Sequence, residues 1–308
     1  MKNNRPLLLL VMITAVVAAA WPAAAFAATD PGLGTAGNFA VLSGTPNITN
    51  TGPTWITGQV GIYPGTAITG FPPGVSGPQH IADGVATVAK TDLTAAYTNA
   101  AAQPCPPGVY PAGNDLTGQN LGGKTLGPGV YCQTTAPTLT GTLTLSGAGI
   151  YIFQIGSTLV TANGAVVSLT GGADPCNIFW QVGSSATIAP TTTMIGNIMA
   201  LTSIGMQTGA SLTGRALARN GAVTLDTNRI IQPSGCTYAA NPTVVAAPGA
   251  VAATPTPAAT ATPASRVGLP NTGGPPQQPG FPWLPLAIAG AIGATLFGLR
   301  RRTHKRGS

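Results

Sequence analysis

The side chains able to carry out acid–base or nucleophilic chemistry are few in this sequence and scattered along it. The aspartates stand singly and there is no glutamate, and His80 is the one histidine in their region. The six carboxylates are Asp30, Asp83, Asp92, Asp115, Asp174 and Asp226. Hydrolysis of a polysaccharide needs paired carboxylates, and serine-type hydrolysis needs Ser, His and Asp together. We therefore expect neither an enzyme nor a bound cofactor.

The N-terminus has the three parts of a secretory signal peptide. Lys2 and Arg5 form a basic start, residues 7–20 are apolar, and Ala25-Phe26-Ala27 supplies the small residues of a cleavage site. A membrane-spanning helix is the alternative, but the apolar stretch is short for one. We expect cleavage after Ala27 and secretion of the remaining chain.

Four cysteines follow this signal, namely Cys105, Cys132, Cys176 and Cys236. An even number in an exported chain indicates two disulfides, for which three pairings are possible. We favour the nearest-neighbour choice, Cys105 with Cys132 and Cys176 with Cys236, although the spacing leaves all three open. A zinc site is the competing interpretation, but the spacings are wide and a single histidine lies in this region. We expect no metal.

Residues 269–308 combine a short motif, a polar spacer, an apolar run and a basic tail. The motif is Leu269-Pro270-Asn271-Thr272-Gly273, the apolar run covers residues 283–299, and basic side chains lie within residues 300–306. This order resembles the sorting signal of sortase-anchored surface proteins. The resemblance implies transient membrane insertion of the apolar run, sortase cleavage between Thr272 and Gly273, and attachment to peptidoglycan at the cell surface. A permanent membrane anchor is the alternative.

The net charge of +7 belongs to these terminal signals, because residues 28–240 are almost neutral. Residues 28–240 contain the six aspartates and five basic residues, namely Lys90, Lys124, Arg215, Arg219 and Arg229. A net charge of +7 would suggest nucleic acid as a partner, but the domain at residues 28–240 does not carry this excess of positive charge. A surface of uncharged Thr, Ser, Asn and Gln suits an uncharged, extended target, and we expect a monomer.

One long helix is predicted over about residues 78–103. Ser76 and Gln79 fit a capping box, and Pro104 ends the pattern. Apolar residues recur between them at spacings of three and four, which predicts that the helix packs along one side: Ile81, Val85, Val88, Ala89, Leu93, Ala96, Tyr97 and Ala100. Residues 241–268 are rich in Ala, Pro and Thr and lack apolar periodicity, which predicts an extended stalk.

The rest of residues 28–240 is rich in Gly and Thr, with short apolar runs such as residues 151–155 that predict β-strands. Four segments in the second half resemble one another at intervals of about 20–30 residues, the length of one solenoid coil. A side chain that recurs in each coil would form a straight row at the strand spacing of about 4.8 Å. The pattern therefore predicts a mainly β, solenoid domain.

Four segments of this domain, residues 33–42, 49–53, 64–74 and 214–225, resemble the microbial ice-binding protein family. The resemblance extends over about residues 30–233. It implies a right-handed β-solenoid of triangular section, with one long α-helix packed along it and an N-terminal coil stacked beside the C-terminal coils. It also implies binding to ice through one flat face of the solenoid.

In that family the face often carries Thr, then Ala or Gly, then any residue, then Thr or Asn. Residues 66–69 match this motif and residues 208–211 match with Ser in last place, whereas residues 161–164 fail at the last position and residues 190–193 fail at the first. We expect weak to moderate activity for that reason. Threonine suits the role because its methyl and hydroxyl groups lie on a stiff χ1. The predicted face consists of Thr66, Thr69, Thr161, Asn163, Thr191, Thr193, Thr208, Ser211 and Thr227.

An adhesin that grips a carbohydrate or another surface with the same scaffold is the principal alternative. Attachment to the wall favours adhesion, because a protein that protects fluid from freezing would more usefully diffuse away. Exposed aromatic residues in a groove would indicate a carbohydrate partner, whereas a flat threonine-rich face would indicate ice. The sequence thus predicts a cell-wall-anchored ice-binding protein or ice adhesin.

Overall fold

The computed structural model describes residues 27–240. The predicted signal peptide, except for Ala27, the predicted stalk at residues 241–268 and the predicted sorting signal at residues 269–308 lie outside the described residues. Within residues 27–240, no helix combines the length and the hydropathy that a membrane crossing requires.

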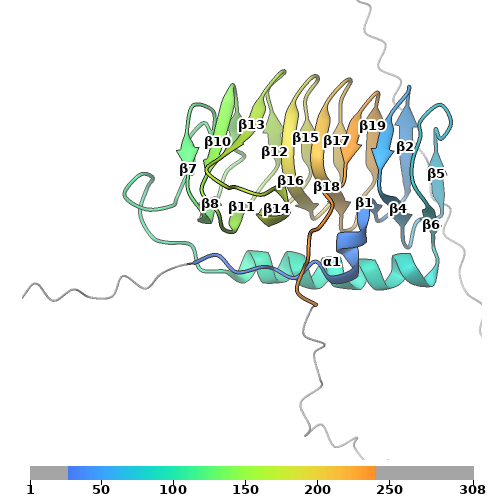
Figure 1. The fold of residues 1–308 in the computed structure, drawn as a ribbon, viewed down its shortest axis with the longest axis horizontal. Helices are drawn as coiled ribbons and strands as arrows, with labels where there is room; N and C mark the ends of the chain where they lie inside the picture. The colour runs from blue at the N-terminus through green and yellow to red at the C-terminus, as the bar shows by residue number, and fades with distance from the viewer. Residues whose placement is uncertain (1–26, 241–308) are drawn as a thin grey trace, which may run out of the picture. The chain divides into compact units, whose positions relative to one another are not determined.

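The chain winds into coils whose strands stack in parallel to form three faces (Figure 1). The helix face contains β6 (Gln79–Ile81), β4 (Gln59–Ile62), β1 (Phe39–Ser43), the second halves of β18 (Ser211–Ala218) and β16 (Thr193–Ala200), β14 (Ile178–Val182), β11 (Tyr151–Ile155) and β8 (Gly129–Gln133). The threonine face contains β5 (Ala67–Thr69), β2 (Asn47–Thr51), β19 (Val223–Asp226), β17 (Ile204–Met206), β15 (Ala186–Ile188), β12 (Leu159–Thr161) and β9 (Thr138–Leu139). The tryptophan face contains β3 (Trp55–Thr57), β20 (Arg229–Ile231), the first halves of β18 and β16, β13 (Val166–Thr170), β10 (Thr142–Ser146) and β7 (Thr125–Leu126). A mainly β fold of stacked coils is thus confirmed.

Two strands, β16 and β18, each bend from the tryptophan face onto the helix face without interruption. The bends lie at Gly196 and Gly214, which adopt φ angles of 107° and 153°. A Cβ atom on Gly214 would lie 1.9 Å from the carbonyl oxygen of Gly196. Glycine is therefore required at Gly214, because only its missing side chain allows adjacent coils to stack through the corner.

The first coils of the chain stack directly on the last ones. Strand β1 pairs with β18, β2 with β19 and β3 with β20, and Figure 1 shows the blue strands beside the orange ones. The amide of Asn228 donates to the hydroxyl oxygen of Thr54 at 3.0 Å across this junction. This arrangement is the one that the resemblance implied.

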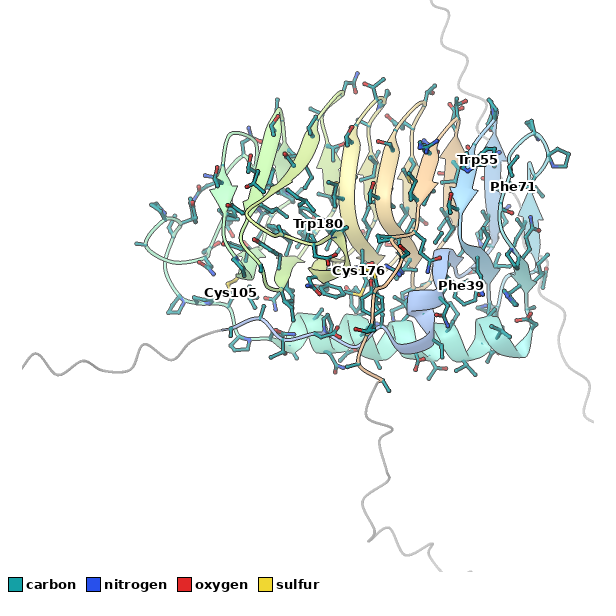
Figure 2. The ribbon with its side chains drawn as sticks, in the orientation of Figure 1. Phe39, Trp55, Phe71, Cys105, Cys176 and Trp180 are labelled. Atoms are coloured by element: carbon teal, nitrogen blue, oxygen red, sulfur yellow. A yellow bond between two sulfur atoms is a disulfide. The ribbon has the colours of Figure 1, made fainter. Side chains whose placement is uncertain are left out.

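The interior of the solenoid is filled by branched and small apolar side chains with a short stack of aromatic rings. The ring centroids of Tyr131 and Phe153 lie 5.4 Å apart, and those of Phe153 and Trp180 lie 4.1 Å apart. Trp180 is fully buried, and its indole nitrogen donates to the carbonyl oxygen of Ile195 at 2.9 Å (Figure 2). The core is therefore closed and leaves the outer side chains of the coils to meet the surroundings.

Helix α1 (Gly84–Ala102) begins later than the sequence predicted. Residues 79–81 form β6 on the edge of the helix face, where the amide of Val60 donates to the carbonyl oxygen of Pro78. The N-cap is Asp83, whose carboxylate accepts a hydrogen bond from the amide of Ala86 at 2.8 Å. The predicted capping box of Ser76 and Gln79 is wrong, because strand pairing holds these residues outside the helix.

One side of α1 is buried against the helix face. Ala89, Leu93 and Tyr97 pack in a cluster with Ile152 and Met199, among other residues. The predicted stripe is correct from Ala89 onward but wrong at its start, since three of its residues are 44–52% exposed: Ile81, Val85 and Val88. Ile81 lies before the helix, in β6. Val85 and Val88 lie in the first turns of α1, on the side that does not face the solenoid.

The domain also contains two short 3₁₀ helices, η1 (Gly34–Asn38) and η2 (Pro175–Asn177), and two disulfides. Cys105 is bonded to Cys132, and Cys176 to Cys236, which is the nearest-neighbour pairing. Figure 2 shows Cys105 close to the C-terminal end of α1. The first bridge thus links the segment after α1 to β8, and the second links η2 to the segment after β20.

Candidate functional site

A straight row of outward-facing residues runs along the middle of the threonine face. Its members are joined by the register of neighbouring strands, and we call them the central row: Thr138, Val160, Thr187, Gly205, Thr224, Thr49 and Thr69. None of the seven is buried. Each lies at the same place in its coil, so the row has the strand spacing of about 4.8 Å.

The row forms because side chains in a strand alternate between the two sides of a sheet. Thr224 lies between Val223 and Leu225, which are buried in the core, and Thr49 lies between the buried Ile48 and Asn50. The buried neighbours anchor each short strand from inside and hold the central residue outward. The β-branched side chain of threonine also has few χ1 rotamers, so the row is rigid before it binds anything.

The charge on the threonine face is confined to Asp226, at the end of β19. Its carboxylate accepts hydrogen bonds from the hydroxyl groups of Thr208 and Thr227. Gly205 interrupts the row because it has no side chain. A shallow hollow of about 540 Å³ also lies on this face, lined by Thr224 and Gln207 among other residues. Apart from this hollow, the face presents uncharged, closely spaced hydroxyl and methyl groups.

The residues predicted from the sequence do not share one face. Thr69 lies in the central row, and the exposed Thr66 lies just before β5. Four others form a ridge where the chain leaves the threonine face: Asn163, Thr191, Thr208 and Thr227. All four are exposed, and the amide of Thr191 donates to the carbonyl oxygen of Thr208. Thr193 and Ser211 are paired with each other on the tryptophan face.

Thr161 is a wrong prediction, because it points into the solenoid. It is 3% exposed, its hydroxyl oxygen accepts a hydrogen bond from the amide of Ala189 at 2.9 Å, and it shares a second with the hydroxyl of Thr192 at 3.1 Å. Val160, one residue earlier, is the outward residue of the same strand. A shift of one position exchanges the two sides of a strand, and the motif could not reveal this shift.

Four threonines of the central row were missed, namely Thr49, Thr138, Thr187 and Thr224. All four stand alone between two buried residues, as in Ala186-Thr187-Ile188. This triplet pattern of buried, outward and buried residues was visible in the sequence and would have found them. The family motif instead pointed to the ridge. In residues 208–211 the first position of the motif is Thr208, which follows the end of β17 and so lies outside the strands of the threonine face.

Several ionisable groups of the domain have structural partners. Hydrogen bonds from the amide of Ala86 and from His80 lower the pKa of Asp83, the helix cap. Burial lowers the pKa of Arg215, whose guanidinium donates to the carbonyl oxygen of Gly37 at 2.7 Å and to Asn197 Oδ1 at 3.0 Å. Over residues 27–240, no three His, Cys, Asp or Glu side chains gather in a way that could hold a metal ion. The arrangement can adsorb a surface through the threonine face, and the described residues offer no paired carboxylates for hydrolysis.

Comparisons with known proteins point to one group. A family model described as "Ice-binding-like" matches residues 41–231. The chain is 45% identical over 236 residues to an ice-binding protein of Nostoc sp. (strain HG1), a match that covers 75% of this chain and 84% of that protein. It is 37% identical over 216 residues to an ice-binding protein of Flavobacterium frigoris (strain PS1), with 65% of this chain and 76% of that protein covered.

Solved structures agree with these matches. An ice-binding protein from an Antarctic biological consortium is 46% identical, with a TM-score of 0.61 over 67% of this chain and 92% of that chain. An ice-binding protein from the Antarctic ascomycete Antarctomyces psychrotrophicus is 39% identical, with a TM-score of 0.62 over 67% of this chain and 99% of that chain. The matched region makes up 92% and 99% of those two chains, respectively.

Proposed function

Because this chain belongs to the Ice-binding-like family, we propose that its domain binds ice, and that it does so through the threonine face. The observation that carries the choice of face is the central row, an evenly spaced line of outward residues across seven coils. Ice presents neither charge nor a pocket, so recognition must come from a large, flat and regular surface. The threonine face has these properties.

The rigidity of the face lowers the entropy cost of adsorption. The backbone is fixed by parallel pairing on both sides, and threonine loses little rotamer freedom when its surroundings become ordered. Each hydroxyl can hold a water molecule while the neighbouring methyl group confines it, so that the row orders water into a layer that merges with ice. The even strand spacing makes this layer regular along the row.

The other two faces suit ice less well. The helix face is covered by α1, which buries side chains such as Met199 and Leu217. The tryptophan face has the same parallel strands but carries the charged Arg229 and the large indole of Trp55, which is 53% exposed. Both would disturb a flat layer of ordered water. Gly205 and Val160 leave two gaps in the hydroxyl pattern of the threonine face, so we expect moderate rather than strong activity.

The growth of a single ice crystal in a solution of residues 28–240 tests the ice-binding function. We expect a faceted crystal and a gap between its melting and freezing temperatures. Thr224→Tyr would place a bulky ring in the central row and should reduce the gap strongly. Thr193→Tyr, at an exposed strand position on the tryptophan face, is the matched control and should leave the gap unchanged.

The outcomes of this experiment distinguish a failure of ice binding from a wrong choice of binding face. Rounded crystals and no temperature gap with the wild-type domain would exclude ice binding. A normal gap with Thr224→Tyr and a reduced one with Thr193→Tyr would place the binding surface on the tryptophan face instead.

We propose further that this domain is exported and attached to the cell wall, which would make it an ice adhesin. The support is the signal at residues 1–27 and the sorting signal at residues 269–308, in which Thr272 would be joined to the wall. The Ala-, Pro- and Thr-rich residues 241–268 would carry the domain through the wall. A protein held on the outside of a cell by its C-terminus would fasten that cell to ice.

Fractionation of cells that express the full chain with a sortase tests the anchoring. We expect the protein in the wall fraction, released by a muramidase. Thr272→Ala should move it to the membrane fraction or the medium. Asn271→Ala changes the variable position of the motif and should leave the anchoring intact, whereas equal release of both variants without muramidase would rule the anchoring out.

A further inference from the structure

An exposed aromatic patch lies on the tryptophan face, apart from the threonine face. Trp55 is 53% exposed and Val75 48%, and Arg229 is also exposed. Trp55 is paired with Arg229 on one side and bridges to Val75 on the other, so the three side chains follow one another across neighbouring strands. Figure 2 shows Trp55 on the side of the coils away from α1. We call these three residues the Trp55 patch.

The guanidinium of Arg229 has no partner among the described residues. The other four cationic side chains of this region are all held by protein groups. Lys90 and Arg215 donate to backbone carbonyl oxygens, Lys124 to Gln119, and Arg219 lies 5.3 Å from the ring centroid of Tyr97. The side chain of Arg229 makes no hydrogen bond, ion pair or ring contact within residues 27–240. Its five N–H donors are therefore open to a ligand.

The surroundings of Arg229 favour an anion. The strands of the tryptophan face contain no acidic residue, and the nearest one along the chain, Asp226, is occupied by Thr208 and Thr227. Along the same row, Ser211 is paired with Arg229 and offers a hydroxyl group. One open cation, one exposed indole and the hydroxyl group of Ser211 thus follow one another across three neighbouring strands.

We propose that the Trp55 patch binds an anionic polysaccharide, specifically a chain of uronic acid rings. The C–H face of a pyranose ring can lie flat on the exposed indole of Trp55. The carboxylate carried by such a ring can then point toward the neighbouring strand, about 4.8 Å away, which carries Arg229. The guanidinium fork of Arg229 matches a carboxylate in a bidentate pair.

Two other anionic polymers fit the patch less well. Single-stranded nucleic acid needs several cations along its phosphates and a series of aromatic side chains for its bases, whereas this patch has one of each. A polyol phosphate has no ring in its backbone to stack on Trp55. The uronate chain uses both the indole and the guanidinium, and its site leaves the threonine face free for ice.

Affinity electrophoresis of residues 28–240 in gels that contain alginate tests the proposal, with neutral dextran gels as the reference. We expect alginate, and not dextran, to retard the domain. Trp55→Ala and Arg229→Gln should each weaken this retardation by about tenfold, as loss of a main contact does in other interfaces. Arg229→Lys should fall between, because it keeps the charge without the fork. Val160→Ala, an exposed apolar position on the threonine face, is the matched control and should bind alginate as the wild type does.

Thermal unfolding and ice-crystal growth accompany each variant. We expect Trp55→Ala and Arg229→Gln to unfold and to shape ice as the wild-type domain does, so that a failure of this proposal and a failure of ice binding are distinguishable. Alginate retardation that Trp55→Ala leaves unchanged would overturn the proposal. Equal retardation by dextran, or tighter binding to polyglycerol phosphate or to oligo(dT) than to alginate, would also overturn it.

Discussion

The Nζ atom of Lys90 lies 2.6 Å from the carbonyl oxygen of Ala218, so a side chain of α1 donates directly into the solenoid. A second hydrogen bond of 2.6 Å reaches the carbonyl oxygen of Arg219. Lys90 is only 7% exposed. Burial, helped by the positive charge of Arg219, lowers the pKa of Lys90 from its usual 10.5 to about 7. The contact therefore couples the stability of the helix packing to pH.

We predict that the free energy of unfolding increases with pH between about 7 and 10. In this window the unfolded chain keeps the Lys90 proton that the folded chain has lost, and a difference of one proton gives a slope of at most about 1.4 kcal/mol per pH unit. Urea unfolding at several pH values measures it. Above this window the sign reverses, because burial raises the folded-state pKa of Tyr131 and of Tyr238 to about 12.

Lys90→Met should flatten this pH dependence, because the methionine cannot titrate. The variant should also be less stable, since the two carbonyl oxygens lose their donor at a cost of about 1–3 kcal/mol. The slope of the free energy of unfolding against pH is the informative quantity. A variant that keeps the wild-type slope would assign the pH dependence to another group.

Completion of the central row should increase ice activity. At Gly205 a new Cβ atom would lie 3.3 Å from Oγ1 of Thr224, a side-chain atom that can move slightly, so Gly205→Thr fits. Val160→Thr replaces an exposed side chain with one of nearly equal shape. We expect each variant to widen the gap between melting and freezing temperatures. Ile195→Thr, which adds a hydroxyl to the tryptophan face, should have no such effect, and an equal gain there would contradict the choice of face.

Thr161→Val should affect stability and not ice activity. The substitution keeps the shape of the side chain but leaves the buried amide of Ala189 without its acceptor, at a cost of about 1–3 kcal/mol. Thermal unfolding should detect this loss, while the folded protein shapes ice normally. Reduced ice shaping at unchanged stability would show that Thr161 reaches the surface after all.

Removal of either disulfide should lower stability by about 2–5 kcal/mol, as is usual for small secreted domains. The Cys176–Cys236 bridge closes the longer loop, with a sequence separation of 60 against 27, and it holds the segment in which the hydroxyl of Tyr238 bonds to Arg215. We therefore expect C176S/C236S to be less stable than C105S/C132S in urea. The opposite order would show that the segment after β20 contributes little.

Several features could be predicted because they depend on local chemistry. Periodic apolar residues from Ala89 to Ala100 indicated the helix, and alternating runs such as Tyr151–Ile155 indicated strands. The start of α1 could not be predicted, because the pairing of β6 with β4 competes with the capping box of Ser76 and Gln79. A local signal was overruled there by a contact with a distant strand.

The proposed binding face depends on the tertiary structure to a greater extent. By itself the sequence determined a nearly uncharged, threonine-rich domain of stacked coils, because composition and alternation require only neighbouring residues. It did not determine which threonines align, because the coils differ in length and because a shift of one residue turns a strand over. Thr49 and Thr224 become neighbours only when the first coils of the chain stack on the last ones. Only parallel pairing of distant strands could turn scattered threonines into a row.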